Sequence, residues 1–488
     1  MLSEGETTSV ELVRACMRQM QRTRKMNAYV SKISEELVLE EAEKADRRRS
    51  RGEAAGVLSG IPLAVKDNYA VRNTHTTCSS KMLENFVSPY DSTVTARLES
   101  AGGIIVGKTN MDEFAMGSMT STSFFGPTIS PWSFAFGGYP DARETGGRLV
   151  SPGGSSGGSA VAVCSGTAFA ATGTDTGGSV RLPSAWTGLV GFKPSYGACS
   201  RFGIVKFASS LDTPGLFSKC VQDARILFDV VSSPDPADST SVVPSEGRRP
   251  KRKIGIPSEF NISELSDEIR ELWTSGIRLF ENQGYDIVDV SLPHAPYALP
   301  CYYIISPAEA FSNLAKYDGV RYGHRATSGD TVFEMYSRSR SEGFGEEVQR
   351  RILLGAIALS NRFPGLNLNK AMQIRRLIRD DFKSAFDNVD AILTPTAATP
   401  AVFMNDANET DQIHMYLTDA MTVPANMAGI PAISVPMTLS RSGLPMGLQL
   451  MAPMFQDRLL LEVAEILEEP WQSNLEENVR ALKPVLST

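Results

Sequence analysis

Residues 151–181 read SPGGSSGGSAVAVCSGTAFAATGTDTGGSVR, a stretch with eight glycines and six serines in 31 positions. Glycine adopts backbone conformations that other residues avoid, and it lets the main chain approach a ligand closely. Residues 158–171 are compatible with a helix of small residues that packs against a sheet and has no catalytic duty. Such a helix explains less well why Ser155 and Ser179 lie in glycine-flanked turns on either side of it.

Two common glycine-rich motifs fit this stretch poorly. It contains neither G-x-x-x-x-G-K-[ST] nor a strand–G-x-G-x-x-G–helix unit, which disfavours a nucleotide site. Residues 153–157, GGSSG, match G-x-S-x-G, but only Leu149 and Val150 are available as the buried strand that a nucleophile elbow requires. The four histidines have no metal-ligand spacing, which disfavours zinc and leaves a histidine-containing triad open.

The second turn favours a nucleophilic serine. In residues 174–179, TDTGGS, successive small residues can direct several N–H groups toward one point, as an oxyanion hole around Ser179 requires. The expected base is a lysine, because burial lowers the pKa of lysine and makes the neutral amine available. Residues 61–66, IPLAVK, place Lys66 after five apolar residues, so we expect Lys66 to be buried although most lysines are solvated.

Three segments together resemble the amidase signature family. They are residues 60–67 (GIPLAVKD), 153–159 (GGSSGGS) and 173–179 (GTDTGGS). The resemblance implies a Ser-cisSer-Lys triad, in which Ser179 is the acyl-forming nucleophile, Ser155 bridges after a cis peptide, and Lys66 is the base. It further implies that the oxyanion is held by backbone N–H groups of Ser179 and of the three residues before it: Thr176, Gly177 and Gly178.

Five further segments resemble one branch of that family, the glutamine-hydrolysing subunits of tRNA-dependent amidotransferases. They are residues 108–117 (KTNMDEFAMG), 191–197 (GFKPSYG), 313–323 (NLAKYDGVRYG), 347–355 (EVQRRILLG) and 426–436 (NMAGIPAISVP).

The resemblance implies glutamine as the substrate. Glutamine is a zwitterion, so its carboxylate needs a cation such as arginine and its ammonium needs a carboxylate. By position, the counterparts of the substrate-binding residues are Tyr302, Arg351 and Asp419. Two alternatives remain open, since Arg350 could replace Arg351 and Tyr302 could be core packing beside Tyr303.

The resemblance also implies partner proteins, the amidotransferase subunits B and C. The first would receive the ammonia and use ATP with Mg²⁺ to activate the γ-carboxylate of Glu-tRNA(Gln), and the second, a small protein, would complete a heterotrimer. This chain would hold no cofactor and no metal. Its 48 Lys+Arg against 55 Asp+Glu give a net charge of −7, which disfavours unaided nucleic-acid binding. A stand-alone amidase and a non-catalytic scaffold are the alternatives, and three intact triad residues argue against the scaffold.

The expected fold is α/β: the amidase signature fold, a single large mixed, mostly parallel sheet surrounded by helices. Residues 253–292 read strand, helix, strand, and residues 92–107 read helix, strand, which indicates parallel pairing. Later elements are expected as strands at 391–394, 432–435 and 447–450, and as helices at 346–359, 371–386 and 458–467.

We expect one domain over residues 1–488. Its parts are an N-terminal helical segment at about 1–55, the signature core at about 56–230, a linker at about 232–252 and a second part of the same sheet at 253–488. The linker ends in a basic cluster that favours a solvated surface loop over a nucleic-acid patch.

The location of the protein is suggested by an insertion at residues 133–148, where mitochondrial members of the branch carry one. This predicts the mitochondrial matrix. The N-terminus shows no presequence, so a cytoplasmic protein of a bacterium or archaeon is the alternative. No stretch supplies the roughly 20 apolar residues of a membrane-spanning helix, and the six scattered cysteines are typical of reduced thiols.

Overall fold

The computed structural model describes residues 1–53, 56–137, 147–242, 250–360, 367–404 and 418–482. Eleven strands form one sheet in the order β1-β3-β2-β4-β6-β5-β10-β11-β9-β7-β8. Their bounds are β1 Tyr29–Lys32, β2 Pro62–Lys66, β3 Ile104–Thr109, β4 Ala170–Thr174, β5 Val190–Lys193, β6 Pro214–Ser218, β7 Lys253–Pro257, β8 Asp286–Val290, β9 Ala391–Pro395, β10 Ala432–Leu439 and β11 Pro445–Met451.

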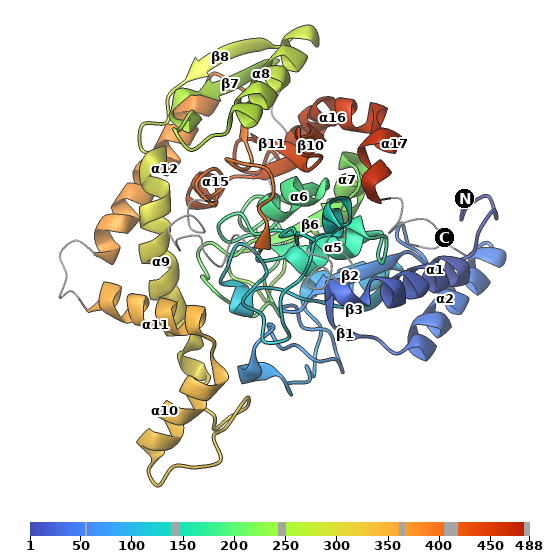
Figure 1. Ribbon diagram of the computed structural model, residues 1–488, viewed down its shortest axis with the longest axis vertical. Helices are drawn as coiled ribbons and strands as arrows, with labels where there is room; N and C mark the ends of the chain where they lie inside the picture. The colour runs from blue at the N-terminus through green and yellow to red at the C-terminus, as the bar shows by residue number, and fades with distance from the viewer. Residues whose placement is uncertain (54–55, 138–146, 243–249, 361–366, 405–417, 483–488) are drawn as a thin grey trace.

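Helices surround this sheet (Figure 1), as the sequence predicted. Their bounds are α1 Ser9–Arg22, α2 Glu35–Ser50, α3 Thr93–Ser100, α5 Gly157–Cys164, α6 Arg181–Thr187, α7 Val221–Val231, α8 Asp267–Asn282, α9 Ala298–Asn313, α10 Val332–Gly343, α11 Glu346–Leu359, α12 Leu368–Phe386, α15 Val423–Ala428, α16 Asp457–Ser473 and α17 Leu475–Asn478.

The sheet is continuous across the predicted linker. Strands that precede residue 232 occupy one half of it, and strands that follow residue 252 occupy the other half. The halves join where β10 pairs with β5 antiparallel, with Ala432 opposite Lys193. The single-domain organisation stays a prediction, which this continuity supports. Within the linker, residues 243–249 lie outside the described residues.

The expectation of a mostly parallel sheet was wrong. Among the described strands, six of ten pairings are antiparallel and four are parallel. The parallel pairs lie toward the two ends of the sheet, where helical crossovers such as α3 and α8 separate the paired strands. In the middle, β10 and β11 are joined by a short turn at residues 440–444, and a short connection of this kind produces antiparallel pairing.

Local signals placed many elements correctly. Thr8 and Glu11 form a capping box at the start of α1, and the Ser92 side chain caps α3. The helix expected at 346–359 is α11, and the strand–helix–strand pattern at 253–292 is β7, α8 and β8.

Two local interpretations were wrong. The small-residue helix expected over 158–171 stops at Cys164, because Gly166 takes a left-handed φ of +72° that ends the helix, and β4 begins at Ala170. The N-terminal helical segment also contains β1, which pairs antiparallel with β3 at one edge of the sheet.

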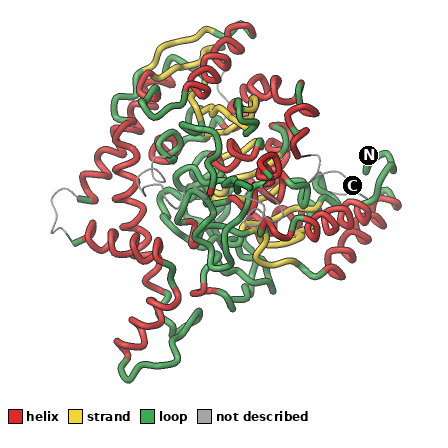
Figure 2. The backbone as a smooth tube through the Cα atoms, viewed as in Figure 1, coloured by secondary structure: helices red, strands yellow, loops and turns green. Residues whose placement is uncertain are grey.

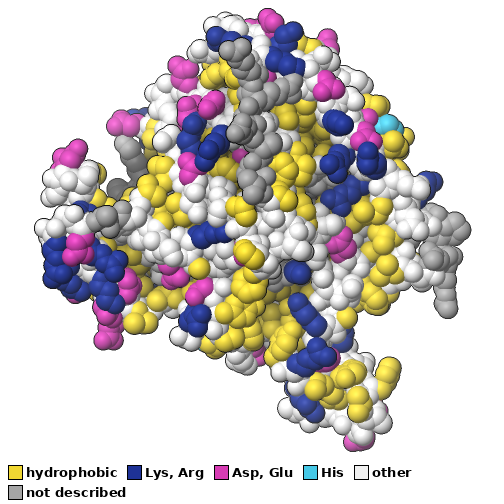
Figure 3. Space-filling view, turned by 180° about the vertical axis from the view of Figure 1, so that it is seen from behind, with side chains coloured by type: hydrophobic (Ala, Val, Ile, Leu, Met, Phe, Trp, Pro, Cys, Tyr) yellow, Lys and Arg dark blue, Asp and Glu magenta, His cyan; other side chains and the backbone are white. Residues whose placement is uncertain are grey.

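Helices α9, α11 and α12 form a flank on the left of Figure 1, and α10 projects below them as an arm. Figure 2 shows loops gathered at the centre of the molecule, beside this flank. Helix α11 approaches α9 closely at Gly355, where a Cβ atom would lie 2.0 Å from the Pro307 carbonyl oxygen. A side chain larger than that of glycine would separate the two helices. Figure 3 shows the arm from behind, with hydrophobic and basic side chains exposed along it.

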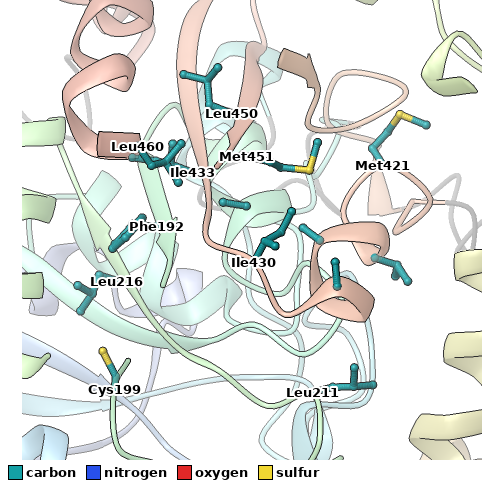
Figure 4. Packing of buried hydrophobic residues seen from close by; sticks show 14 of the residues in the cluster. Phe192, Cys199, Leu211, Leu216, Met421, Ile430, Ile433, Leu450, Met451 and Leu460 are labelled. Carbon is teal, nitrogen blue, oxygen red and sulfur yellow. The ribbon is translucent and has the colours of Figure 1, made fainter. Parts of the chain in front are cut away.

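The largest hydrophobic cluster lies along the middle of the sheet. Figure 4 shows Phe192 of β5, Leu216 of β6, Ile433 of β10 and Leu460 of α16 in this cluster, and all are buried. Burial of each such side chain stabilises the fold by about 1.5–3 kcal/mol. The sheet that carries Lys66 is therefore stabilised by a large buried core.

Three properties concern disulfide bonds, membrane spans and metal sites. All six cysteines are free thiols in the structure. In the part of the chain that the structure describes, no helix is long and apolar enough to cross a membrane. Across the same residues, no group of three or more His, Cys, Asp or Glu side chains could hold a metal ion.

Candidate active site

Strand β2 delivers Lys66 into the interior. The whole strand is buried between β3 and β4, with which it pairs parallel, and Lys66 is its last residue. The Lys66 backbone N–H donates to Thr172 Oγ1 at 3.1 Å, which fixes the strand end against β4. The apolar sequence before Lys66 thus places a lysine inside the protein, as expected.

The Lys66 amine contacts two hydroxyl groups. Its Nζ donates to Ser155 Oγ at 2.9 Å and to Thr174 Oγ1 at 2.8 Å, and Lys66 is 0% exposed. Burial lowers the pKa of Lys66 to about 7, although Asp112 and Asp175 favour the charged form. A large fraction of the amine is therefore neutral near pH 7 and can accept a proton.

Ser155 lies in a loop held by Asp112. The Gly154–Ser155 peptide is cis. Gly154 is needed for space, because a Cβ atom there would lie 2.2 Å from Asp112 Oδ2. The same carboxylate accepts the N–H groups of residues 120–122, and the Asp112 N–H donates to the Ser155 carbonyl at 3.1 Å. These contacts fix the Ser155 hydroxyl opposite the lysine.

The loop that carries Ser179 is anchored by Asp175. Arg181 donates to both Asp175 oxygens, and Asn426 Nδ2 donates to Asp175 Oδ1 at 2.8 Å. Burial raises the pKa of Asp175, but Arg181 outweighs it and holds the value at about 2. Because this pair is fully buried and has further hydrogen bonds, breaking it would leave an uncompensated charge.

Gly177 and Gly178 let the loop pass close to its neighbours. A Cβ atom would lie 2.9 Å from Tyr302 Cζ at Gly177 and 2.1 Å from Thr422 Oγ1 at Gly178, where φ is +139°. The adjacent Thr176 donates its hydroxyl to Asp212 Oδ1 at 2.8 Å. The Thr176 side chain is thus directed to Asp212, and Gly177 and Gly178 have no side chain. Only main-chain groups of these three residues are therefore left for the predicted oxyanion hole.

The three triad candidates differ in exposure. Lys66 and Ser155 are 0% exposed, whereas Ser179 is 8% exposed. Ser179 is therefore the member of the set that solvent or a substrate reaches.

Helix α11 presents two neighbouring arginines in different directions. Arg351 is 4% exposed, and its Nε donates to Glu347 Oε1 at 2.7 Å. Its guanidinium lies 5.6 Å from the ring centroid of Phe207 and 5.4 Å from that of Tyr303. The Arg350 side chain is 35% exposed. Between the two alternatives left by the sequence, Arg351 is the one that points inward.

Asp419 and Tyr302 complete the group on the substrate side. Asp419 is 8% exposed and accepts from Ser118 Oγ at 2.9 Å. Burial raises the pKa of Asp419 to about 7, against the opposing effect of Arg351. Tyr302 of α9 packs its ring against Gly177, and its pKa is raised by burial, with Arg351 lowering it and Asp419 raising it further. The fold thus brings these residues close to the Ser179 loop.

Sequence reasoning missed the residues that hold the site in place. The contacts described above are made by five residues that the sequence did not single out: Thr174, Asp112, Asp212, Arg181 and Asn426. Thr174 and Arg181 lie within or next to the glycine-rich stretch, so a search for hydroxyls near the lysine could have found Thr174. Asn426 lies 251 residues from Asp175, and no local pattern predicts their contact.

Comparison with known proteins places the chain in a family. The profile of the family described as Amidase matches residues 11–461. The A subunit of glutamyl-tRNA(Gln) amidotransferase from Xanthobacter autotrophicus is 49% identical over 477 residues, which cover 96% of this chain and 94% of that protein. Its counterpart from Roseobacter denitrificans is 46% identical over 479 residues, with the same coverage of both chains.

Solved structures agree in fold. The crystal structure of the glutamyl-tRNA(Gln) amidotransferase A subunit from Thermotoga maritima superposes with a TM-score of 0.75 at 36% identity, covering 96% of this chain and 92% of that one. A bacterial aryl acylamidase of the amidase signature family, at 22% identity, gives a TM-score of 0.80 over 100% of this chain and 96% of that one. With most of its length matched at this level, the chain belongs to the amidase family.

Proposed function

We propose that this chain is the glutaminase component of a glutamyl-tRNA(Gln) amidotransferase, with a Ser179–Ser155–Lys66 triad. The observation that carries the proposal is the buried 2.9 Å contact between Lys66 Nζ and Ser155 Oγ, and the greater exposure of Ser179 suits the serine that attacks the substrate. The names of the most similar proteins reported above support the choice of reaction.

In the acylation step, Ser179 Oγ attacks the carboxamide carbon of glutamine. Its proton passes to Ser155 while the Ser155 proton passes to the neutral amine of Lys66. The negative charge that develops on the carboxamide oxygen is held by N–H groups of the oxyanion residues 176–178. The relay leaves Lys66 as an ammonium ion and Ser155 neutral.

Collapse of the tetrahedral intermediate breaks the C–N bond. The proton on Lys66 returns through Ser155 to the leaving nitrogen, which departs as ammonia, and Ser179 remains as an acyl ester. Water then attacks this ester and its proton passes through Ser155 to Lys66. As the acyl–Oγ bond breaks and glutamate leaves, that proton returns through Ser155 to Ser179 Oγ. Lys66 ends each cycle as a neutral amine, so its lowered pKa suits both directions of transfer.

Substrate selection is assigned to Arg351, Asp419 and Tyr302. The guanidinium of Arg351 would bind the α-carboxylate, and Asp419 would bind the α-ammonium. A carboxyl with a pKa raised to about 7 becomes fully ionised when a cation binds beside it. Tyr302 would form one wall of the pocket. The two opposite charges favour a zwitterionic substrate over a simple apolar amide.

The proposal includes subunits B and C as partners in a heterotrimer. Binding of ATP and Mg²⁺ and most contacts with Glu-tRNA(Gln) are assigned to the first of these partners, and this chain is expected to need no cofactor. The net charge of −7 supports this division of labour, because it provides no general attraction for RNA.

The mitochondrial location predicted from residues 133–148 has no support in the relatives, which are bacterial. A cytoplasmic location is the alternative that they favour. Residues 138–146 of that segment lie outside the described residues, and the role of the insertion stays a prediction.

A stand-alone amidase is the second candidate, since the aryl acylamidase shares the fold. The first experiment measures ammonia release from glutamine by the chain alone and with subunits B and C, ATP and Glu-tRNA(Gln). Release that rises with the partners and is lost in Ser179→Ala supports the proposal. Hydrolysis of simple amides without partners, with glutamine left intact, would establish the stand-alone enzyme instead.

The arginine assignment has a matched control on the same helix. Arg351→Ala should raise the KM for glutamine sharply, whereas Arg350→Ala, which removes the more exposed of the two partners of Glu347, should leave it near the wild-type value. Equal KM values in the two variants would remove Arg351 from the site.

A further inference from the structure

A cleft of about 620 Å³ lies outside the site described above, and Ser179, Arg351 and Asp419 do not line it. It lies between the loops that follow β2, the segment at residues 201–206 and the end of α9. Its lining includes five aromatic residues, Phe86, Tyr90, Phe202, Tyr317 and Tyr322, and three basic residues, Arg201, Lys206 and Lys316. We call it the lysine–aromatic cleft.

The aromatic rings of the cleft are unusually exposed. Tyr90, Phe202 and Tyr322 are 43%, 42% and 39% exposed. They are arranged as neighbours, with ring centroids 5.6 Å apart for Tyr90 and Phe202 and 5.8 Å apart for Phe86 and Tyr322. Gathered aromatic side chains in a hollow are typical of the centre of a protein interface, because covering them removes a large apolar area from water.

The charges of the cleft do not cancel. Asp238 accepts two hydrogen bonds from the Arg201 guanidinium, at 2.9 and 3.1 Å, and one from the Arg201 backbone N–H, so this carboxylate and this guanidinium neutralise each other. Lys206 and Lys316 are exposed, and within the described residues no carboxylate lies at ion-pair distance from either ammonium. Two positive charges therefore face the hollow without a local counterion.

We infer that the lysine–aromatic cleft docks an acidic segment, bearing at least one large apolar side chain, from a partner protein of the amidotransferase assembly. The inference rests on the function proposed above. Carboxylates of the segment would pair with Lys206 and Lys316, and its apolar side chain would pack between the exposed rings. RNA is the less suitable ligand, because two cations are few beside the 6–10 phosphate contacts of a typical nucleic-acid site and the chain carries a net charge of −7.

The wall of the cleft is continuous with the catalytic strand. The Val205 N–H donates to the Asn68 carbonyl at 2.9 Å, and Tyr69 forms an isolated bridge with Ile204. The Tyr69 hydroxyl donates to the Gly173 carbonyl at 2.6 Å. A segment bound in the cleft would thus press on residues that begin two positions after Lys66. Docking would hold the end of β2 in place and couple assembly to glutamine hydrolysis.

The test is co-purification of the full chain with subunits B and C on an affinity tag. The Lys206→Glu/Lys316→Glu variant should bind the partners at least tenfold more weakly than wild type. A matched control, Lys370→Glu/Lys383→Glu, makes the same charge change at exposed lysines of α12 and should assemble normally. Phe202→Ala tests the apolar contact without changing charge and should also weaken assembly. Each variant is checked by its melting temperature and its ammonia release.

The outcomes separate the hypotheses. Loss of assembly in the cleft variants alone, with wild-type binding weakened by salt, supports the inference. Normal assembly of the cleft variants overturns it and leaves the proposed function standing. Equal loss in the control variant also overturns the inference, since the effect would then come from general electrostatics.

Normal assembly with weakened Glu-tRNA(Gln) binding would identify RNA as the ligand. If wild type itself fails to bind subunits B and C, the proposed function fails and this inference falls with it.

Discussion

Two buried lysines lie side by side at the ends of adjacent parallel strands, and their partners make them different. Lys66 ends β2, and Lys108 lies opposite Val65 on β3. Both are 0% exposed, and burial lowers the pKa of both. Lys108 Nζ lies 3.3 Å from Asp67 Oδ1, whereas Lys66 donates only to hydroxyls in the part of the chain that is described. Burial is common to both lysines, so the carboxylate bound to Lys108 is what sets it apart from Lys66.

The largest expected effect comes from removing the base. Lys66→Met should lower kcat/KM for glutamine by at least about a thousandfold, because the proton of the attacking serine then has no acceptor. The variant should stay folded, since methionine fills the space and only hydroxyl contacts are lost. Ammonia release and chemical denaturation measure the two quantities. A variant that retains a tenth of the activity would exclude Lys66 as the base.

The neighbouring lysine should behave in the opposite way. Lys108→Met should reduce the free energy of unfolding by about 3–5 kcal/mol, because Asp67 is left as a buried charge without its cation. Activity per folded molecule should fall less than in Lys66→Met. Adding Asp67→Asn to the same chain should restore part of the lost stability. A loss below about 1 kcal/mol would show that this ion pair is not structural.

The hydroxyl group of Thr174 is a further difference between the surroundings of Lys66 and those of Lys108. Thr174 Oγ1 accepts from Lys66 Nζ at 2.8 Å and from Asn68 Nδ2 at 3.2 Å. Holding one amine hydrogen toward Thr174 directs the amine lone pair toward Ser155. Thr174→Val should therefore lower kcat about 10- to 100-fold with little change in KM, and Thr174→Ser should remain close to wild type. Similar losses in both variants would show that the methyl packing matters and the hydroxyl does not.

The smallest effect is a change in pH dependence. The pKa of Lys66 is about 7 in the folded protein against an ordinary value of 10.5, so between these values the unfolded chain binds one more proton. The stability of the wild type should therefore rise with pH across this window relative to Lys66→Met, and kcat/KM should rise through about pH 7 to a plateau. The pKa of Lys193 is also lowered to about 7, so only the difference between the two proteins isolates Lys66. Parallel stability curves would contradict the assignment.

Sequence reasoning succeeded where the signal was local. Five apolar residues placed Lys66 in a buried strand, where its amine contacts Ser155. The catalytic roles of Ser155 and Ser179, chosen from their flanking glycines, stay predictions. Sequence reasoning failed where the structure depends on distant partners. Strand β6, Pro214–Ser218, contains proline and glycine, which normally argue against a strand, yet it pairs with both β4 and β5. The directions of central strands likewise depend on neighbours remote in sequence.

The choice between the two candidate substrate-binding arginines shows the same limit of sequence reasoning. Arg350 and Arg351 are adjacent and chemically identical, so the sequence left both open. In the structure Arg351 is buried beside Phe207, whereas the Arg350 side chain is 35% exposed, and both pair with Glu347. The close approach of α11 to α9 at Gly355 fixes the rotation of α11, and it involves a contact with Pro307 that no periodicity reveals.

The difference in exposure between the two triad serines has a practical consequence. An electrophilic reagent that acylates or phosphonylates serine can reach Ser179, which is 8% exposed, but not Ser155, which is 0% exposed. One molecule of reagent should therefore be incorporated per active chain, and peptide mapping should find it on Ser179 alone. Such labelling would count competent molecules in any preparation, before any substrate is added.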